Sequence, residues 1–281
     1  MPGVGPGYGV TMTPRPVRVL TALLIATAAA TVVVEVLNFW YAPDHGTGLA
    51  VRTGWAFART LAWLVLIFQV RRARATAKPL SLILTMTTLF AVGRLIVPAT
   101  GRPPLPGLIG FGVLALLCLT VVVLLHRHPA VDAHLIHQPR RLTLTRDGLK
   151  LREAPPGDPW VLTARLASFS YSPLMLVPAL TAAGTLRHQL EWTLAVLFWI
   201  LAGIAVSYVA LLCAFFVGRG SQTARLTLAS VTLVVVAFDL PLCGILLGAD
   251  GLIRDGAPLV VAAALTLYAL WRTARSPALA G

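Results

Sequence analysis

Four ionisable side chains lie inside long apolar stretches of the sequence, and they are the residues best placed to do chemistry there. Glu35 and Asp239 are acids, whereas Arg59 and Arg94 are cations. An ionised group at the centre of a bilayer costs about 2.5–3.5 kcal/mol even on membrane-insertion scales, so such groups usually face the interior of a helix bundle and find partners. The four charges therefore predict either ion pairs between helices or a polar cavity.

Neighbouring residues extend these charges into polar stripes. Asn38 shares a helical face with Glu35 and with two threonines that precede it. Pro241, two residues after Asp239, removes a helical N–H donor. A broken helix beside an intramembrane acid is typical of binding sites in transporters. We expect Asp239 and Glu35 to line one hydrated cavity. The predicted ligand-binding residues are Glu35, Asn38, Arg59, Arg94 and Asp239.

A structural role is the alternative for the same charges. Glu35 would then pair with Arg59 or Arg94 and hold helices together without any ligand. Arg94, close to the predicted end of its helix, can also extend its guanidinium to the outer membrane surface. Counting residues from the predicted helix ends, at ~1.5 Å per residue, places all four charges in the outer half of the bilayer.

A second polar cluster joins four histidines to Asp132 within twelve residues. Imidazoles at this density can bind zinc, iron or copper. However, His126 and His128 point to nearly opposite sides of a continuing helix, and His134 with His137 does not match the spacing of a helical two-histidine metal motif. We therefore predict no metal site, and the sequence points to no cofactor.

Composition and charge distribution assign the chain to the membrane class. Of its 281 residues, 57% are hydrophobic and 12% are charged, against about 25% charged in soluble domains. A net charge of +13 would suggest nucleic-acid binding in a soluble protein. Because the cations flank the apolar runs, we expect the lipid bilayer as the partner and no nucleic acid.

The apolar runs predict eight membrane-spanning helices, since each span needs about 20 apolar residues. The fifth run is diluted by serine, tyrosine and proline, and seven spans would put the two termini on opposite sides. The predicted fold is an all-α integral membrane protein with a short cytoplasmic β-hairpin between helices four and five. The predicted spans are residues 17–41, 54–70, 80–98, 107–125, 166–186, 190–217, 226–248 and 257–271.

The positive-inside rule orients these spans. With the N-terminus inside, the cytoplasmic segments hold 17 of the 23 lysines and arginines, and both termini are cytoplasmic. We therefore predict a multi-pass protein of the cell membrane. Only four cations remain in outer loops, namely Arg52, Arg102, Arg187 and Arg254. The predicted parts are an N-terminal tail 1–16, membrane helices 17–125, a linker 126–165, membrane helices 166–271 and a C-terminal tail 272–281.

The linker contains a β-hairpin signal, because leucines alternate with polar residues on both sides of Asp147-Gly148. These leucines are Leu142, Leu144, Leu149 and Leu151. A two-stranded hairpin is marginal alone, so the membrane surface or the helix ends should support it. The segment 126–165 serves either as a supported linker or as a docking site for a cytoplasmic protein partner.

Three functions are compatible with these observations. The leading one is binding or transport of a small or lipid-like molecule through a polar cavity open to the outer half of the bilayer. The second is an intramembrane enzyme acting on a lipid or isoprenoid, with Glu35 or Asp239 as the acid. The third is a non-catalytic membrane subunit or assembly factor. The sequence does not decide whether the protein is an enzyme.

Overall fold

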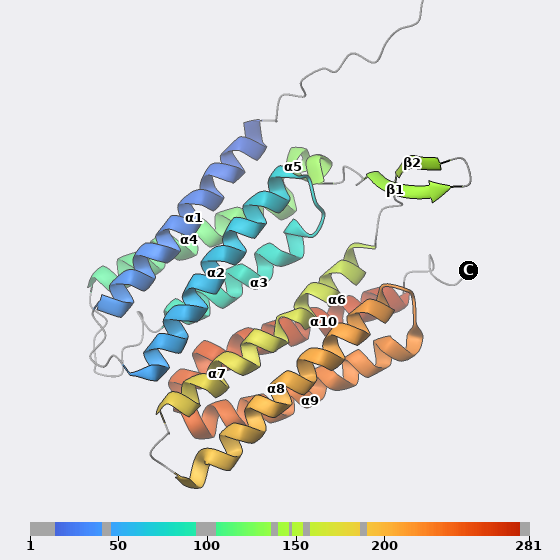
Figure 1. Cartoon of the computed structure of the whole chain (residues 1–281). Helices are drawn as coiled ribbons and strands as arrows, with labels where there is room; N and C mark the ends of the chain where they lie inside the picture. The colour runs from blue at the N-terminus through green and yellow to red at the C-terminus, as the bar shows by residue number, and fades with distance from the viewer. Residues whose placement is uncertain are drawn as a thin grey trace, which may run out of the picture.

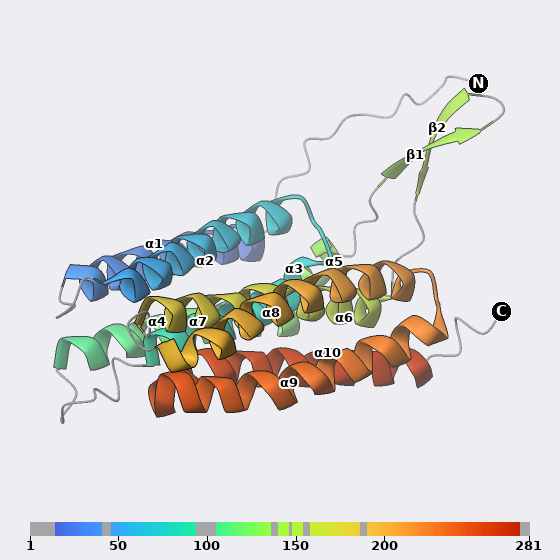
Figure 2. The ribbon, with the colours of Figure 1, turned by 60° about the horizontal axis from the view of Figure 1, so that its bottom comes forward.

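The protein is a bundle of long, nearly parallel helices in two groups, α1 to α5 and α6 to α10 (Figure 1). The structure is a computed structural model, and it describes residues 15–40, 46–93, 105–135, 140–145, 148–153, 158–185 and 190–275. Figure 2 shows α1 and α2 on one side of the bundle, α9 and α10 on the opposite side, and α3, α6, α7 and α8 between them. This arrangement is the all-α, membrane-like class that the sequence predicts.

The first group packs around one apolar cluster that includes the fully buried Trp63 and Leu114. The Trp63 indole N–H donates to Thr88 Oγ1 at 3.2 Å, which links the second helix to the third. A short helix follows the fourth, and its Asp132 accepts a hydrogen bond from Lys78 Nζ at 2.5 Å. The helices of this group are α1 (Arg15–Trp40), α2 (Thr47–Arg71), α3 (Ala77–Val92), α4 (Leu105–Arg127) and α5 (Pro129–Leu135).

The second group begins with two short helices in line, and local capping explains where its helices start. The Asp158 carboxylate accepts a hydrogen bond from the Trp160 N–H, with a proline at the first helical position. The Ser221 hydroxyl caps the helix that begins at Gln222 in the same way, by accepting from the Ala224 N–H. The helices are α6 (Pro159–Phe169), α7 (Tyr171–Thr185), α8 (Leu190–Val217), α9 (Gln222–Gly251), the π-helix η2 (Leu252–Gly256) and α10 (Ala257–Arg275).

A two-stranded antiparallel sheet joins the two groups. Strand β1 (Arg140–Thr145) pairs with β2 (Gly148–Glu153), with Leu142 opposite Leu151 and Leu144 opposite Leu149. Both views place the strands and the ends of the described chain at the same end of the bundle (Figures 1 and 2).

The outer surface of the bundle is apolar. Leu194, Leu116 and Leu201 are each more than half exposed, and they belong to helices whose opposite faces are buried. A soluble protein would not leave so much apolar surface in water. Within the described residues, six helical runs are long and apolar enough to cross a membrane, so this is a multi-pass membrane-type architecture. They are Arg15–Leu37, Thr47–Arg71, Gly107–Arg127, Pro159–Gly184, Glu191–Val217 and Gln222–Arg275.

The helix boundaries correct several sequence-based expectations. The last of the six runs contains two rods, α9 and α10, and α3 is a shorter apolar helix. Helix α2 begins at Thr47 and not at residue 54, so Arg52 lies within a helix and not in a loop. The segment expected as the fifth span consists of two helices that begin at Pro159, inside the predicted linker. Arg254, expected in an outer loop, lies in η2 and is buried.

The two groups touch mainly through α2 against α7 and through α3 against α6, η2 and α10. At the end away from the termini, Thr47 Oγ1 donates to the Gly184 carbonyl at 3.1 Å. A Cβ atom added to Gly184 would lie 2.7 Å from Thr47 Oγ1 and 2.8 Å from the Gly48 backbone nitrogen. The close approach of α7 to α2 therefore requires glycine at this position.

Gly184→Ala should lower the thermal stability of the purified protein, because the new methyl group forces α7 away from α2. Overpacking of this kind typically costs about 1–3 kcal/mol. The matched control is Gly112→Ala on α4, where an added Cβ meets nothing within 4 Å. Thermal unfolding in detergent compares the variants, and equal melting temperatures for the two would contradict this docking geometry.

Candidate functional site: a charged pocket between the helix groups

The first element of the site is a buried ion pair between α1 and α2. Arg59 donates from Nη2 to Glu35 Oε1 at 2.5 Å, and its side chain is 4% exposed while that of Glu35 is 19% exposed. The Trp55 ring lies one helical turn earlier on α2, with its centroid 5.9 Å from the Arg59 guanidinium carbon. Of the two partners that the sequence allowed for Glu35, the structure shows Arg59.

The second element is a charged π-helix at the start of α10. Arg254 donates from Nη2 to Asp255 Oδ2 at 3.0 Å and lies 3.5 Å from Asp250 Oδ2. Both Arg254 and Asp255 are buried. Gly248, at a φ of 69°, breaks the helix just before this segment in a conformation that favours glycine. The break allows the chain to turn and bring Arg254 and Asp255 back into the bundle.

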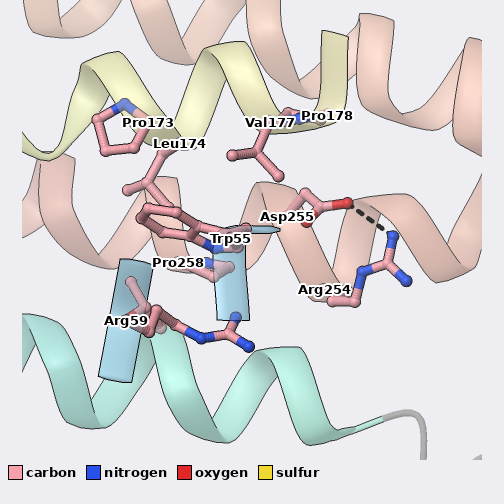
Figure 3. A pocket seen from close by; sticks show the side chains of 10 residues that line it. Trp55, Arg59, Pro173, Leu174, Val177, Pro178, Arg254, Asp255 and Pro258 are labelled. Carbon is pink, nitrogen blue, oxygen red and sulfur yellow. Dashed lines mark hydrogen bonds and ion pairs between the residues drawn. The ribbon is translucent and has the colours of Figure 1, made fainter. Parts of the chain in front are cut away.

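A small pocket lies where these elements meet. Figure 3 shows Trp55 and Arg59 on one side, Arg254 and Asp255 on another, and residues of α7 across from them. Its empty volume is about 230 Å³, counting the part that opens outward, but inside it there is room for at most about one water-sized molecule. The lining residues are Trp55, Arg59, Thr87, Pro173, Leu174, Val177, Pro178, Arg254, Asp255 and Pro258.

The pocket lining combines charge with apolar surface. Two arginines and one aspartate supply the charge, while α7 contributes only apolar side chains. Asp255 and Arg254 both lie close enough to act electrostatically on Arg59. The Arg59 Nε atom is buried and has no hydrogen-bond partner among the residues that the structure describes. Arg59 therefore lines the pocket and has one buried donor without a partner among the described residues.

Asp239 occupies a different place in the second group. Its carboxylate is fully buried and accepts hydrogen bonds from Trp199 Nε1 at 2.7 Å and from Cys243 Sγ at 3.5 Å. Both donor residues belong to an apolar cluster that also includes Val235 and Leu246. Two donors and this packing satisfy the acid within the protein. It lies within electrostatic range of Asp255 but does not line the pocket.

The predicted site residues are thus only partly brought together. The structure joins Glu35 to Arg59, and the pocket lining includes Arg59 but neither Glu35 nor Asp239. Arg94 and the side chain of Asn38 lie outside what the structure describes. Arg59 lies near the middle of α2, because this helix starts earlier than expected, and not near its outer end.

Sequence reasoning missed Arg254 and Asp255. The segment from Gly248 to Gly256 contains three glycines and three charges, which reads as a polar outer loop between two apolar runs. A short, glycine-rich, charged interruption between apolar helices is also the pattern of a broken membrane helix. That signal could have identified these two residues.

The histidine cluster forms no metal site in the part of the chain that the structure covers. Among those residues, no group of three or more histidine, cysteine or acidic side chains could hold a metal ion. His126 Nδ1 lies 3.0 Å from the Val122 carbonyl, and His134 Nε2 lies 3.2 Å from the Val70 carbonyl. His137 lies outside the described residues.

Comparisons with protein-family models, with curated proteins and with solved structures found no match to this chain.

The Glu35–Arg59 pair should be revealed by a double-mutant cycle. Glu35→Gln or Arg59→Gln alone leaves one charge buried without its partner, a loss of about 3–5 kcal/mol in comparable buried pairs. Combining the two changes removes both charges, so the double variant should recover part of the lost melting temperature.

The control for this cycle is the more exposed pair of Lys78 and Asp132, whose side chains are 29% and 46% exposed. Lys78→Gln should change stability little, because exposed ion pairs contribute about 0–1 kcal/mol. If the stability losses of Glu35→Gln and Arg59→Gln simply add in the double variant, the two side chains are not coupled.

Proposed function

We propose that this protein binds a small or lipid-like molecule within the membrane, in the pocket between α2, α3, α7 and η2, and that it serves to transport it. The observation that carries this proposal is the lining of the pocket: a buried arginine with an unused donor and a second ion pair face apolar side chains of α7. Intramembrane charges that are not fully consumed by pairing usually mark ligand pathways.

The position of the pocket between the helix groups supports the same proposal. Arg59 belongs to the first group, and Val177 and Asp255 belong to the second. A change in how the two groups pack would therefore change the pocket directly, as ligand sites at repeat or bundle interfaces do in transporters. Glu35 and Asp239, the acids that an enzyme would use, do not line the pocket, which favours binding over acid catalysis.

For topology, we propose eight crossings with both termini and the segment 126–165 in the cytoplasm of a cell membrane. The support is the distribution of cations, because Arg18, Arg71, Arg219 and Arg272 belong to helix ends or turns on the side of the bundle where the described chain begins and ends. In this orientation the pocket extends from Arg59, near the middle of α2, toward the outer ends of the helices, and the strands can meet a cytoplasmic protein partner.

Filling the pocket should abolish ligand retention without unfolding the protein. Val177→Phe adds a ring to the pocket wall, whereas Leu180→Phe adds the same ring to an exposed position on α7. Native mass spectrometry of the protein, purified from membranes in a mild detergent, should show a bound species that Val177→Phe loses and Leu180→Phe keeps. Equal retention by both variants, or no bound species in the parent protein, would contradict the proposal.

Cysteine labelling tests the proposed topology. The native cysteines at 118, 213 and 243 are all buried and are replaced by alanine. A cysteine introduced at Asp147 should then resist a membrane-impermeant maleimide in intact cells and react after lysis. One introduced at His45, between α1 and α2, should react in intact cells. The opposite labelling pattern would mean that the protein is inserted the other way round. Reaction at both positions in intact cells would contradict the proposal that the strands and the α1–α2 connection lie on opposite sides of the membrane.

A further inference from the structure

The guanidinium of Arg59 has more donors than the protein uses. It carries five N–H groups, and its hydrogen-bond partner among the described residues is a single oxygen of Glu35, reached from Nη2. Its Nε is buried and unpartnered among the residues that the structure describes. A buried donor without an acceptor costs about 1–3 kcal/mol, and more when the group is charged. An acceptor atom in the pocket would remove this cost.

The other polar groups of the pocket are better satisfied. Thr87 donates its hydroxyl to the carbonyls of Ile83 and Leu84 within α3. Arg254 donates to Asp255 and also lies beside Asp250. The Thr87 hydroxyl is thus bonded within its own helix, and Arg254 is paired with two acids. Among these three groups, the hydrogen bonding of Arg59 is the least complete.

The remaining wall of the pocket is apolar. Leu174 and Val177 line it from α7, and Pro258 lines it from the start of α10. Figure 3 shows Leu174 and Val177 on the far side of the pocket from Arg59, with the Trp55 ring and Pro258 between them. A ligand that fits both walls carries a hydrogen-bond acceptor at one end and apolar groups at the other.

We propose that the ligand presents an acidic group, a carboxylate or a phosphate, to Arg59, while its apolar part lies along α7. This inference rests on the proposed function and names the ligand class of the same pocket. Guanidinium groups favour such acids because their N–H donors match pairs of acid oxygens. In the narrow pocket one acid oxygen takes the acceptor position at Arg59, and the rest of the group occupies the part that opens outward.

The charges around the pocket give the proposal a distinctive consequence. Glu35 already neutralises Arg59 from α1 and would repel a second anion. Removing that negative charge should therefore strengthen binding of an acidic ligand, although it destabilises the ligand-free protein. A purely structural role of Arg59 predicts no such gain.

The experiment titrates the full-length protein in a neutral maltoside detergent with four probes and follows the melting temperature. The probes are oleoyl lysophosphatidate, oleate, monoolein with the same chain but no acid, and inorganic phosphate. Lysophosphatidate and oleate should raise the melting temperature in a saturable way, and monoolein should not. Glu35→Gln should bind the acidic lipids about tenfold more tightly or better. The double variant Glu35→Gln, Arg59→Gln should lose the response, and it keeps the test decisive if Glu35→Gln alone fails to fold.

Arg219→Gln is the charge control, because this arginine is exposed in the turn between α8 and α9 and stacks on Phe215. It should respond to the acidic lipids as the parent does. A phosphate response with the same dependence on Arg59 would support the acid group and identify a free anion as its source. If monoolein and lysophosphatidate raise the melting temperature equally, and Val177→Phe abolishes both responses, the ligand needs no acidic group. That result would contradict this inference but leave the proposed function intact. An acidic-lipid response that the double variant retains would also contradict this inference.

Discussion

Burying charge inside a bundle whose outside is hydrocarbon is the constraint on which this structure depends. Water cannot solvate the guanidinium of Arg59, so the protein has to supply the counter-charge. It does so from two directions. Glu35 approaches from α1 with a direct hydrogen bond, and Asp255 acts electrostatically from η2. The packing of α1 on α2 and the position of the π-helix both follow from this need.

The π-helix is the local irregularity that makes the arrangement possible. Gly248 adopts a positive φ, which an L side chain would disfavour, and the chain turns back into the bundle at that point. Arg254 and Asp255 would otherwise lie in a turn at the end of the bundle, in contact with water. Short π-helical segments often occur at functional sites, and here the segment provides one wall of the pocket between the two helix groups.

The contrast between Arg59 and Asp239 separates a binding role from a structural one. Both are buried ionisable groups in the core of the bundle. Asp239 accepts from two donors within its own helix group and lies in an apolar cluster. Arg59 lies between the helix groups, and its bonding is incomplete among the described residues. Burial of charge alone therefore does not separate the two residues. The incomplete bonding of Arg59 beside a pocket is what supports the proposed binding role.

The sequence by itself determined the membrane class, the approximate positions of the apolar helices and the identity of Arg59 as a site candidate. These features follow from composition, hydrophobic run length and the cost of a charge within an apolar run, which are all local properties of the chain. The α8 boundaries agree with the predicted residues 190–217 for this reason.

Only the tertiary structure decided which charges meet. Glu35 lies beside Arg59 because α1 and α2 pack together, and Asp239 bonds to Trp199 because α8 packs on α9. The inward turn of Arg254 and Asp255 depends on one glycine dihedral angle and on the fit of η2 against α3. Helix periodicity fixes the face on which a residue lies, but it carries no information about the partner helix that covers that face.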